Sequence, residues 1–118
     1  MPQASVKRII NCNKKDLIEL VLDIEKYPNF IPYCLSSKVY SREDKINEIL
    51  IVADLTIGKG PFKDTYKSDV KYNKKEGIIF VKNIDGPLKY LDNKWQFKSD
   101  GNYTEVSFDV DFELKNKF

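Results

Sequence analysis

The chain contains no histidine, and this absence excludes several kinds of chemistry. Without an imidazole there is no Ser-His-Asp or Cys-His nucleophile pair and no histidine-ligated metal site. Only two cysteines are present, Cys12 and Cys34, and they do not form a C-x-x-C arrangement. They are either two free thiols, which the lack of any sign of secretion favours, or one disulfide. We predict no metal site.

Arginine is also scarce, since Arg8 and Arg42 are the only two among 20 basic residues. Arginine is the usual residue for bidentate recognition of phosphates and bases, and the net charge is only +2. A nucleic-acid-binding protein that acts through charge alone is therefore not expected. The longest apolar run, 49–53, has about five residues, far fewer than the roughly 20 that cross a bilayer.

What the chain does have suits one globular domain over residues 1–118, with 42% apolar and 32% charged residues. One segment has helical periodicity, with apolar residues at Leu17, Leu20, Val21 and Ile24. Asn13 is a plausible N-cap, and Pro28 limits the helix to about Tyr27.

The rest of the chain alternates with period two, which predicts strands. We place strands at about 3–10, 46–57, 62–72, 78–84, 91–98 and 104–115. The expected order is one strand, the helix and then six strands, of which these ranges bound five. Short turns between the later strands indicate an antiparallel meander, and hence an α+β fold with six to seven strands. One 12-residue helix cannot cover such a sheet, so the sheet must close, be covered or enclose a cavity suited to an apolar ligand.

Two blocks of sequence resemble the coenzyme-Q-binding START-domain family, which also holds the RatA-type ribosome-association toxins and is often called polyketide cyclase/dehydrase. Residues 23–34, D-I-E-K-Y-P-N-F-I-P-Y-C, are similar to the family's D-V-E-x-Y-P-x-F-L-P-W-C. Residues 85–97, with D-G-P-L-K-Y-L followed by W-Q-F, are similar to D-G-P-F-x-x-L-x-x-x-W-x-F. Leu88 stands where the family usually has Phe.

The resemblance implies a START-like helix-grip fold, in which a curved antiparallel sheet wraps a long C-terminal helix and binds ubiquinone or a similar lipid. The chain ends at Phe118, shortly after the last expected strand, so that helix is expected to be missing. We therefore expect either a C-terminally incomplete domain or self-association through the uncovered sheet face, because the exposed apolar patch would be large.

The candidate lipid-binding residues are the aromatic and aliphatic side chains of the Tyr27–Cys34 segment and of the inward positions of three strands. They are Tyr27, Phe30, Ile31, Phe62, Tyr66, Trp95, Phe97, Phe108, Val110 and Phe112. The alternative for each is ordinary core packing. Asp54 interrupts an apolar strand and either orients a polar head group or faces water.

A set of lysines occurs at every fourth position, so all of them fall on the same face of a strand: Lys59, Lys63, Lys67 and Lys71. This spacing predicts a basic stripe on a solvated face. Such a stripe can contact ribosomal RNA phosphates or anionic head groups, although plain solvation is the commoner role. Asp109 and Asp111 face outward, where carboxylates solubilise and do not catalyse.

We therefore expect a non-enzymatic protein that binds ubiquinone or a related isoprenoid and supports respiratory electron transport, with no other cofactor. The alternative is a RatA-like toxin that binds the large ribosomal subunit and blocks subunit association. Cyclase or dehydratase activity is disfavoured by the lack of histidine and of a desolvated acid pair. The expected location is the bacterial cytoplasm, with peripheral membrane contact left open.

Overall fold

The structure is a computed structural model that describes residues 3–30, 33–59 and 61–114. Its elements, in chain order, are β1 (Gln3–Ile10), α1 (Lys14–Leu22), the 3₁₀ helix η1 (Ile24–Asn29), β2 (Cys34–Asp44), β3 (Glu48–Lys59), β4 (Phe62–Asn73), β5 (Ile78–Asp85), β6 (Leu88–Asp100) and β7 (Tyr103–Leu114). The expected absence of a C-terminal helix concerns the stretch after Leu114, which lies outside the described residues.

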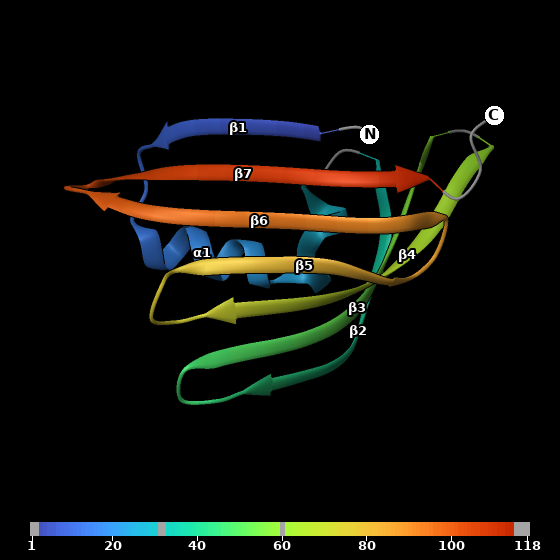
Figure 1. Cartoon of the computed structure of the whole chain (residues 1–118), viewed down its shortest axis with the longest axis horizontal. Helices are drawn as coiled ribbons and strands as arrows, with labels where there is room; N and C mark the ends of the chain where they lie inside the picture. Colours follow the sequence, from blue (N-terminus) through green and yellow to red (C-terminus); the bar gives the residue numbers. More distant parts are fainter. Residues whose placement is uncertain (1–2, 31–32, 60, 115–118) are drawn as a thin grey trace.

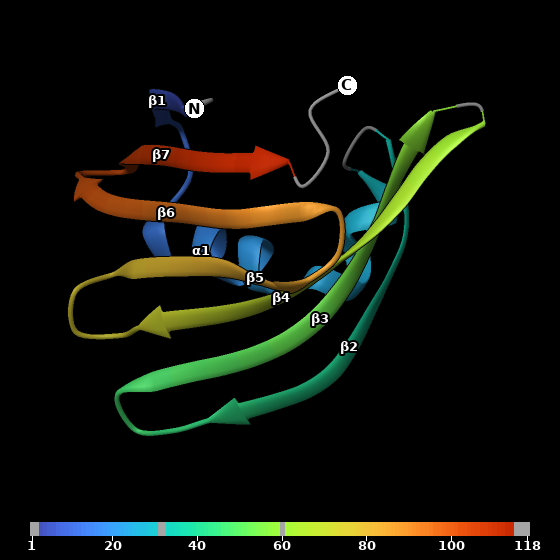
Figure 2. The same ribbon diagram turned by 45° about the vertical axis from the view of Figure 1, so that its right-hand side comes forward.

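All seven strands form one antiparallel sheet in the order β1-β7-β6-β5-β4-β3-β2. Strands β2 to β7 follow one another as a meander, which confirms the prediction, and β1 then pairs with β7. Figures 1 and 2 show the sheet curving, with α1 against one of its faces. We call the face that carries α1 the inner face and the opposite one the outer face.

The helix begins where the sequence predicts it. Asn13 is its N-cap, and the backbone N–H of Asp16 donates to Asn13 Oδ1 at 2.9 Å. The prediction of its end was wrong, because α1 stops at Leu22 and a separate 3₁₀ helix containing Pro28 follows. Asp23, with ψ of 67°, breaks the helical backbone between the two.

The predicted apolar face of the helix was also partly wrong. Leu20 is 47% exposed, whereas Ile18 and Leu22 are buried together with Leu17. Leu17 and Ile24 are buried as predicted, and Val21 packs against the core, so Leu20 is the exception: the buried face of α1 carries residues 17, 18, 21 and 22.

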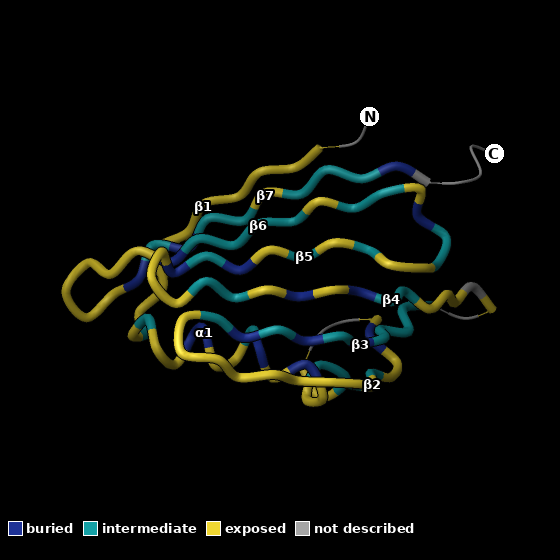
Figure 3. The backbone as a smooth tube through the Cα atoms, turned by 60° about the horizontal axis from the view of Figure 1, so that its bottom comes forward, coloured by how far each residue is buried: buried dark blue, intermediate teal, exposed yellow. Residues whose placement is uncertain are grey.

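The hydrophobic core lies between α1 and the inner face of the sheet. Its central residues are fully or almost fully buried: Ile51, Ile79 and Phe97 are 1%, 0% and 4% exposed. Strand β1, by contrast, is exposed along its whole length, as Figure 3 shows. Cys12 and Cys34 are both free thiols. In the described part of the chain, no helix has the length and apolar character needed to cross a bilayer.

The turn between β5 and β6 depends on Gly86, whose φ is +130°. A Cβ atom at this position would lie 2.9 Å from the backbone oxygen of Thr65 on β4. A glycine is therefore required both by the backbone conformation and by the close approach of β4. Strand β6 begins two residues later with Leu88, whose side chain is buried.

Candidate functional site

A cavity of about 420 Å³ opens on the inner face of the sheet beside α1 and η1. Residues of α1, η1 and strands β3 to β7 line it, and among these none carries a charged side chain. They are Val21, Ile24, Tyr27, Ala53, Leu55, Ile57, Tyr66, Ser68, Val70, Ile79, Val81, Leu88, Leu91, Asn93, Trp95 and Phe112.

Strand alternation and register bring these side chains together. Successive side chains of a strand point to opposite faces, and directly paired residues point to the same face. Leu55 of β3 pairs with Tyr66 of β4, and Leu91 of β6 pairs with Phe112 of β7. The cavity wall is therefore built from the inward positions of neighbouring strands.

Trp95 is held in a fixed orientation on this wall. Its ring stacks on Phe97 with ring centroids 6.3 Å apart and meets Phe108 edge to face at 4.8 Å. Its Nε1–H donates to Asn93 Oδ1 at 3.0 Å, and Asn93 Nδ2 donates to the backbone oxygen of Asp109 at 2.9 Å. The indole therefore presents a rigid apolar surface, and its one polar group is already satisfied.

The structure brings four of the ten candidate lipid-binding residues to the cavity: Tyr27, Tyr66, Trp95 and Phe112. Phe97 lies in the core beneath Trp95, and Phe108 supports Trp95 without lining the cavity. Phe30 is 46% exposed and packs edge to face on Tyr27, and Val110 lines a different groove. Ile31 lies outside the described residues, as does the side chain of Phe62.

Asp54 does not face the cavity. It alternates with Ala53 and Leu55, which line the cavity, and so points to the outer face. Its Oδ2 accepts a hydrogen bond from the hydroxyl of Tyr40, and Lys67 is its cross-strand partner. The Nζ of Lys67 also lies 4.8 Å from the centre of the Tyr40 ring. The suggested head-group role of Asp54 therefore has no geometric support.

Three members of the basic stripe lie on β4, four positions apart and all on its outer face: Lys63, Lys67 and Lys71. Lys59 instead belongs to β3, so the stripe does not run along one strand as predicted, and the side chain of Lys59 lies outside the described residues. Lys71 Nζ is 3.6 Å from Glu48 Oε2, which reduces the positive charge of the stripe.

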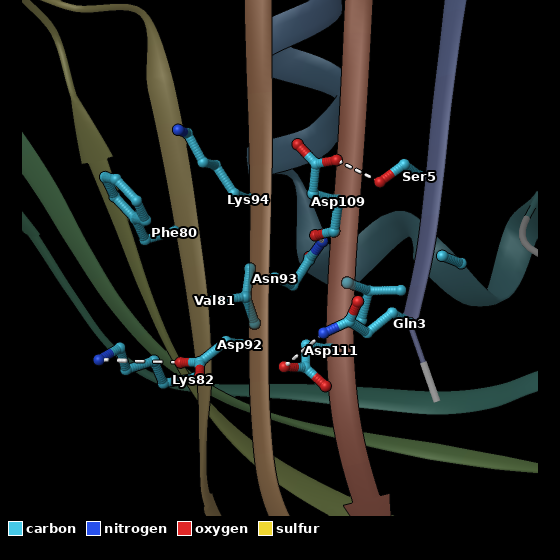
Figure 4. A pocket seen from close by; sticks show the side chains of 12 residues that line it. Gln3, Ser5, Phe80, Val81, Lys82, Asp92, Asn93, Lys94, Asp109 and Asp111 are labelled. Carbon is cyan, nitrogen blue, oxygen red and sulfur yellow. Dashed lines mark hydrogen bonds and ion pairs between the residues drawn. The ribbon is translucent and has the colours of Figure 1, made fainter. Parts of the chain in front are cut away.

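A second groove of about 530 Å³ lies on the outer face, across β5, β6, β7 and β1 (Figure 4). It is larger than the inner cavity, but within the described part of the chain four of its five charged side chains, all except that of Lys94, pair with one another or bond to neighbours. Lys82 Nζ is 3.8 Å from Asp92 Oδ1, and the Ser5 hydroxyl donates to Asp109 at 2.6 Å. Asp109 and Asp111 therefore lie on the outer face, as expected, and the inner cavity is the better candidate site.

Tyr27 closes one side of the cavity, and its hydroxyl donates to the backbone oxygen of Val21. Burial, together with the nearby Cys34 and Asp23, raises the pKa of Tyr27 to about 12. Burial likewise raises the pKa of Tyr66. Both phenols are thus protonated at neutral pH, and neither provides a general base.

The shifted pKa of Tyr27 predicts a loss of stability at high pH. Between pH 10 and 12 the Tyr27 phenol is protonated in the folded state but ionised in the unfolded state. The free energy of unfolding is therefore unaffected below pH 10 and decreases as the pH rises through 12. The loss is about 2 kcal/mol. Urea denaturation of wild type and Tyr27→Phe between pH 9 and 12 should show their stability difference shrinking by this amount. A constant difference would contradict the prediction, and exposed Tyr103→Phe serves as the control.

Comparison with known proteins places the chain in a family. Residues 15–118 match the family described as polyketide cyclase / dehydrase and lipid transport. The chain is 29% identical over 110 residues to the ribosome association toxin RatA of Rickettsia prowazekii, covering 91% of this chain and 73% of that protein. It is 36% identical over 80 residues to the mitochondrial coenzyme Q-binding protein COQ10 of Dictyostelium discoideum, covering 67% and 38%.

Solved structures agree on the fold. A START superfamily protein from Mycobacterium smegmatis superposes with a TM-score of 0.82 at 18% identity, covering 98% of this chain and 79% of that one. This likeness confirms the START-like fold expected from the two sequence blocks. Because the family match spans nearly all of the described strands and both helices, the chain belongs to the polyketide cyclase / dehydrase and lipid transport family.

Proposed function

We propose that this protein binds ubiquinone or a related isoprenoid lipid in the inner-face cavity and thereby supports respiratory electron transport, without catalysing a reaction on the lipid. The observation that carries the proposal is the cavity itself, which has an aromatic wall and no charged lining residue. Apolar walls with a few polar groups are typical of sites for small apolar ligands. The coenzyme Q-binding relative supports the choice of ligand.

The size of the cavity limits how much of the lipid it holds. Sites for drug-sized ligands have volumes of roughly 300–1,000 Å³, and this cavity, at about 420 Å³, lies in the lower part of that range. A ring and the first isoprene units fit, and the rest of a long tail extends through the opening. Each buried CH₂ group contributes about 0.8 kcal/mol to binding.

The direct test is to purify the protein from its own host and identify the extracted lipids by mass spectrometry. We expect a quinone at close to stoichiometric amounts. Addition of ubiquinone to delipidated protein should also change the fluorescence of Trp95, which is the only tryptophan and lines the cavity. Absence of any co-purified isoprenoid together with an unchanged Trp95 signal would refute the proposal.

Association with the ribosome is a second candidate, supported by the relatives named ribosome association toxin. Contact with ribosomal RNA would use a basic surface, and the outer face of β4 presents Lys63, Lys67 and Lys71. If this surface makes the contact, reversing all three to Glu should weaken co-sedimentation with large subunits at least tenfold and flatten its dependence on salt.

The matched control reverses three exposed lysines elsewhere, Lys15, Lys26 and Lys98, and so changes the net charge equally. Binding lost in the β4 variant but retained in this control identifies the stripe as the contact. Equal binding by both variants at low salt would exclude the stripe. Quinone binding should be unaffected in both, because the cavity lies on the other face of the sheet.

A further inference from the structure

One hydroxyl that lines the cavity has no hydrogen-bond partner in the described part of the protein. We infer, on the basis of the proposed lipid-binding function, that the Ser68 hydroxyl is the hydrogen-bonding point for an oxygen of the ligand, with the Tyr66 hydroxyl beside it. The cavity would then select neutral lipids that carry a carbonyl or hydroxyl oxygen over both pure hydrocarbons and anionic lipids.

Ser68 lies on β4 at an inward position, is 5% exposed and lines the cavity. Its hydroxyl has no hydrogen-bond partner among residues 3–30, 33–59 and 61–114. The hydroxyl faces the open cavity, so in the empty protein water can solvate it. A purely apolar ligand that displaces this water would leave the hydroxyl unpaired at a cost, whereas a ligand oxygen that accepts its proton avoids that cost. The serine is therefore better explained by a bound polar atom than by packing.

Tyr66 adds a second hydroxyl on the same side of the same strand. Residues two apart along a strand are separated by about 6.6 Å and point to one face. Within the described residues the Tyr66 hydroxyl also has no hydrogen-bond partner. Burial raises its pKa, so it remains a donor at neutral pH. Because both residues line the cavity, a ligand there has a second donor within the same wall.

The other polar groups of the cavity are already engaged. The Tyr27 hydroxyl donates to the backbone oxygen of Val21, and the Trp95 Nε1–H donates to Asn93 Oδ1. Asn93 in turn donates to the backbone of Asp109. Ser68 and Tyr66 therefore carry the cavity hydroxyls that are not engaged, and Asn93 keeps one further N–H of its amide.

The charge of the cavity argues for a neutral ligand. No lysine or arginine lines it, so a carboxylate or phosphate inside would lose its water without gaining a counter-ion. Lys67 lies between Tyr66 and Ser68 in sequence, but strand alternation directs it to the outer face, where it contacts Tyr40. The basic stripe therefore does not serve this site.

The test measures three probes by displacement of the neutral dye Nile red. They are a ubiquinone with two isoprene units, an aryl hydrocarbon with the same tail but no oxygen, and palmitate. Wild type should bind the quinone most tightly. Ser68→Ala should lower quinone affinity about three- to tenfold, the effect of one hydrogen bond, and leave hydrocarbon affinity unchanged. Tyr66→Phe should act in the same direction.

Ser107→Ala on β7, an outward position of the sheet, is the matched control and should change neither affinity. Ser68→Ala should also unfold at the same temperature as wild type or higher, because the hydroxyl it removes has no partner in the empty protein. Unchanged quinone affinity in Ser68→Ala, or palmitate binding as tight as quinone binding, would overturn the inference while leaving lipid binding intact. Wild type that binds neither quinone nor hydrocarbon would overturn both.

Discussion

Phe97→Ala is expected to lower the free energy of unfolding by about 3 to 5 kcal/mol, the usual cost of removing a buried phenylalanine ring. Phe97 is 4% exposed, belongs to the core under α1 and stacks on Trp95. Removal of the Phe97 ring leaves a cavity between α1 and the sheet, and the surrounding side chains can fill it only in part. Urea denaturation followed by circular dichroism measures the change.

The control for this variant is Phe80→Ala on the neighbouring strand β5. Phe80 is 37% exposed on the outer face, so the same substitution should cost less than about 1 kcal/mol. Similar losses in the two variants would mean that the inner face does not form the core. Because the two residues lie on opposite faces of adjacent strands, the comparison also checks which face of the sheet α1 covers.

Leu91→Asp is expected to reduce quinone affinity at least a hundredfold with only a small loss of stability. Leu91 lines the cavity and is partly exposed, so in the empty protein water solvates the new carboxylate. A bound lipid would displace that water and leave an unpaired charge against an apolar ligand, which costs several kcal/mol. Titration of ubiquinone against Trp95 fluorescence measures the effect.

Ile84→Asp introduces the same charge at a residue of β5 that is 53% exposed and does not line the cavity, and it should leave the affinity unchanged. If Leu91→Asp binds quinone like wild type, the ligand does not occupy the inner-face cavity. If both variants lose binding equally, the effect is one of net charge and not of position. The two variants therefore separate the location of the ligand from general electrostatics.

Much of the fold could be predicted because alternation is a direct consequence of strand geometry. In β7 the apolar residues occur at every second position, and the strand was found at Tyr103–Leu114 with its partners antiparallel. Short turns between strands then fixed the meander. The pairing of β1 with β7 joins segments far apart in the chain, and no local pattern could have revealed it.

The cavity residues were harder to predict where a strand is apolar on both faces. In β3 the run Ile49–Ala53 offers no alternation, so the sequence alone could not show that Ala53 and Leu55 face inward and Asp54 outward. Sheet curvature has a similar effect, because Phe112 reaches the cavity and Val110, at the same parity, does not. Ser68 was overlooked because a lone serine in a strand carries no signal until its burial is known.

The position of β1 has a consequence for the order in which the domain assembles. The meander can grow by successive hairpins, each closing a short loop, whereas β1 must find β7 across a separation such as the 104 positions between Ser5 and Asp109. β1 is also exposed along its whole length and therefore gains little from burial. It is thus suited to dock last and to detach first, and its departure would open the sheet edge at β7 while the Trp95 wall and the core beneath α1 stay in place.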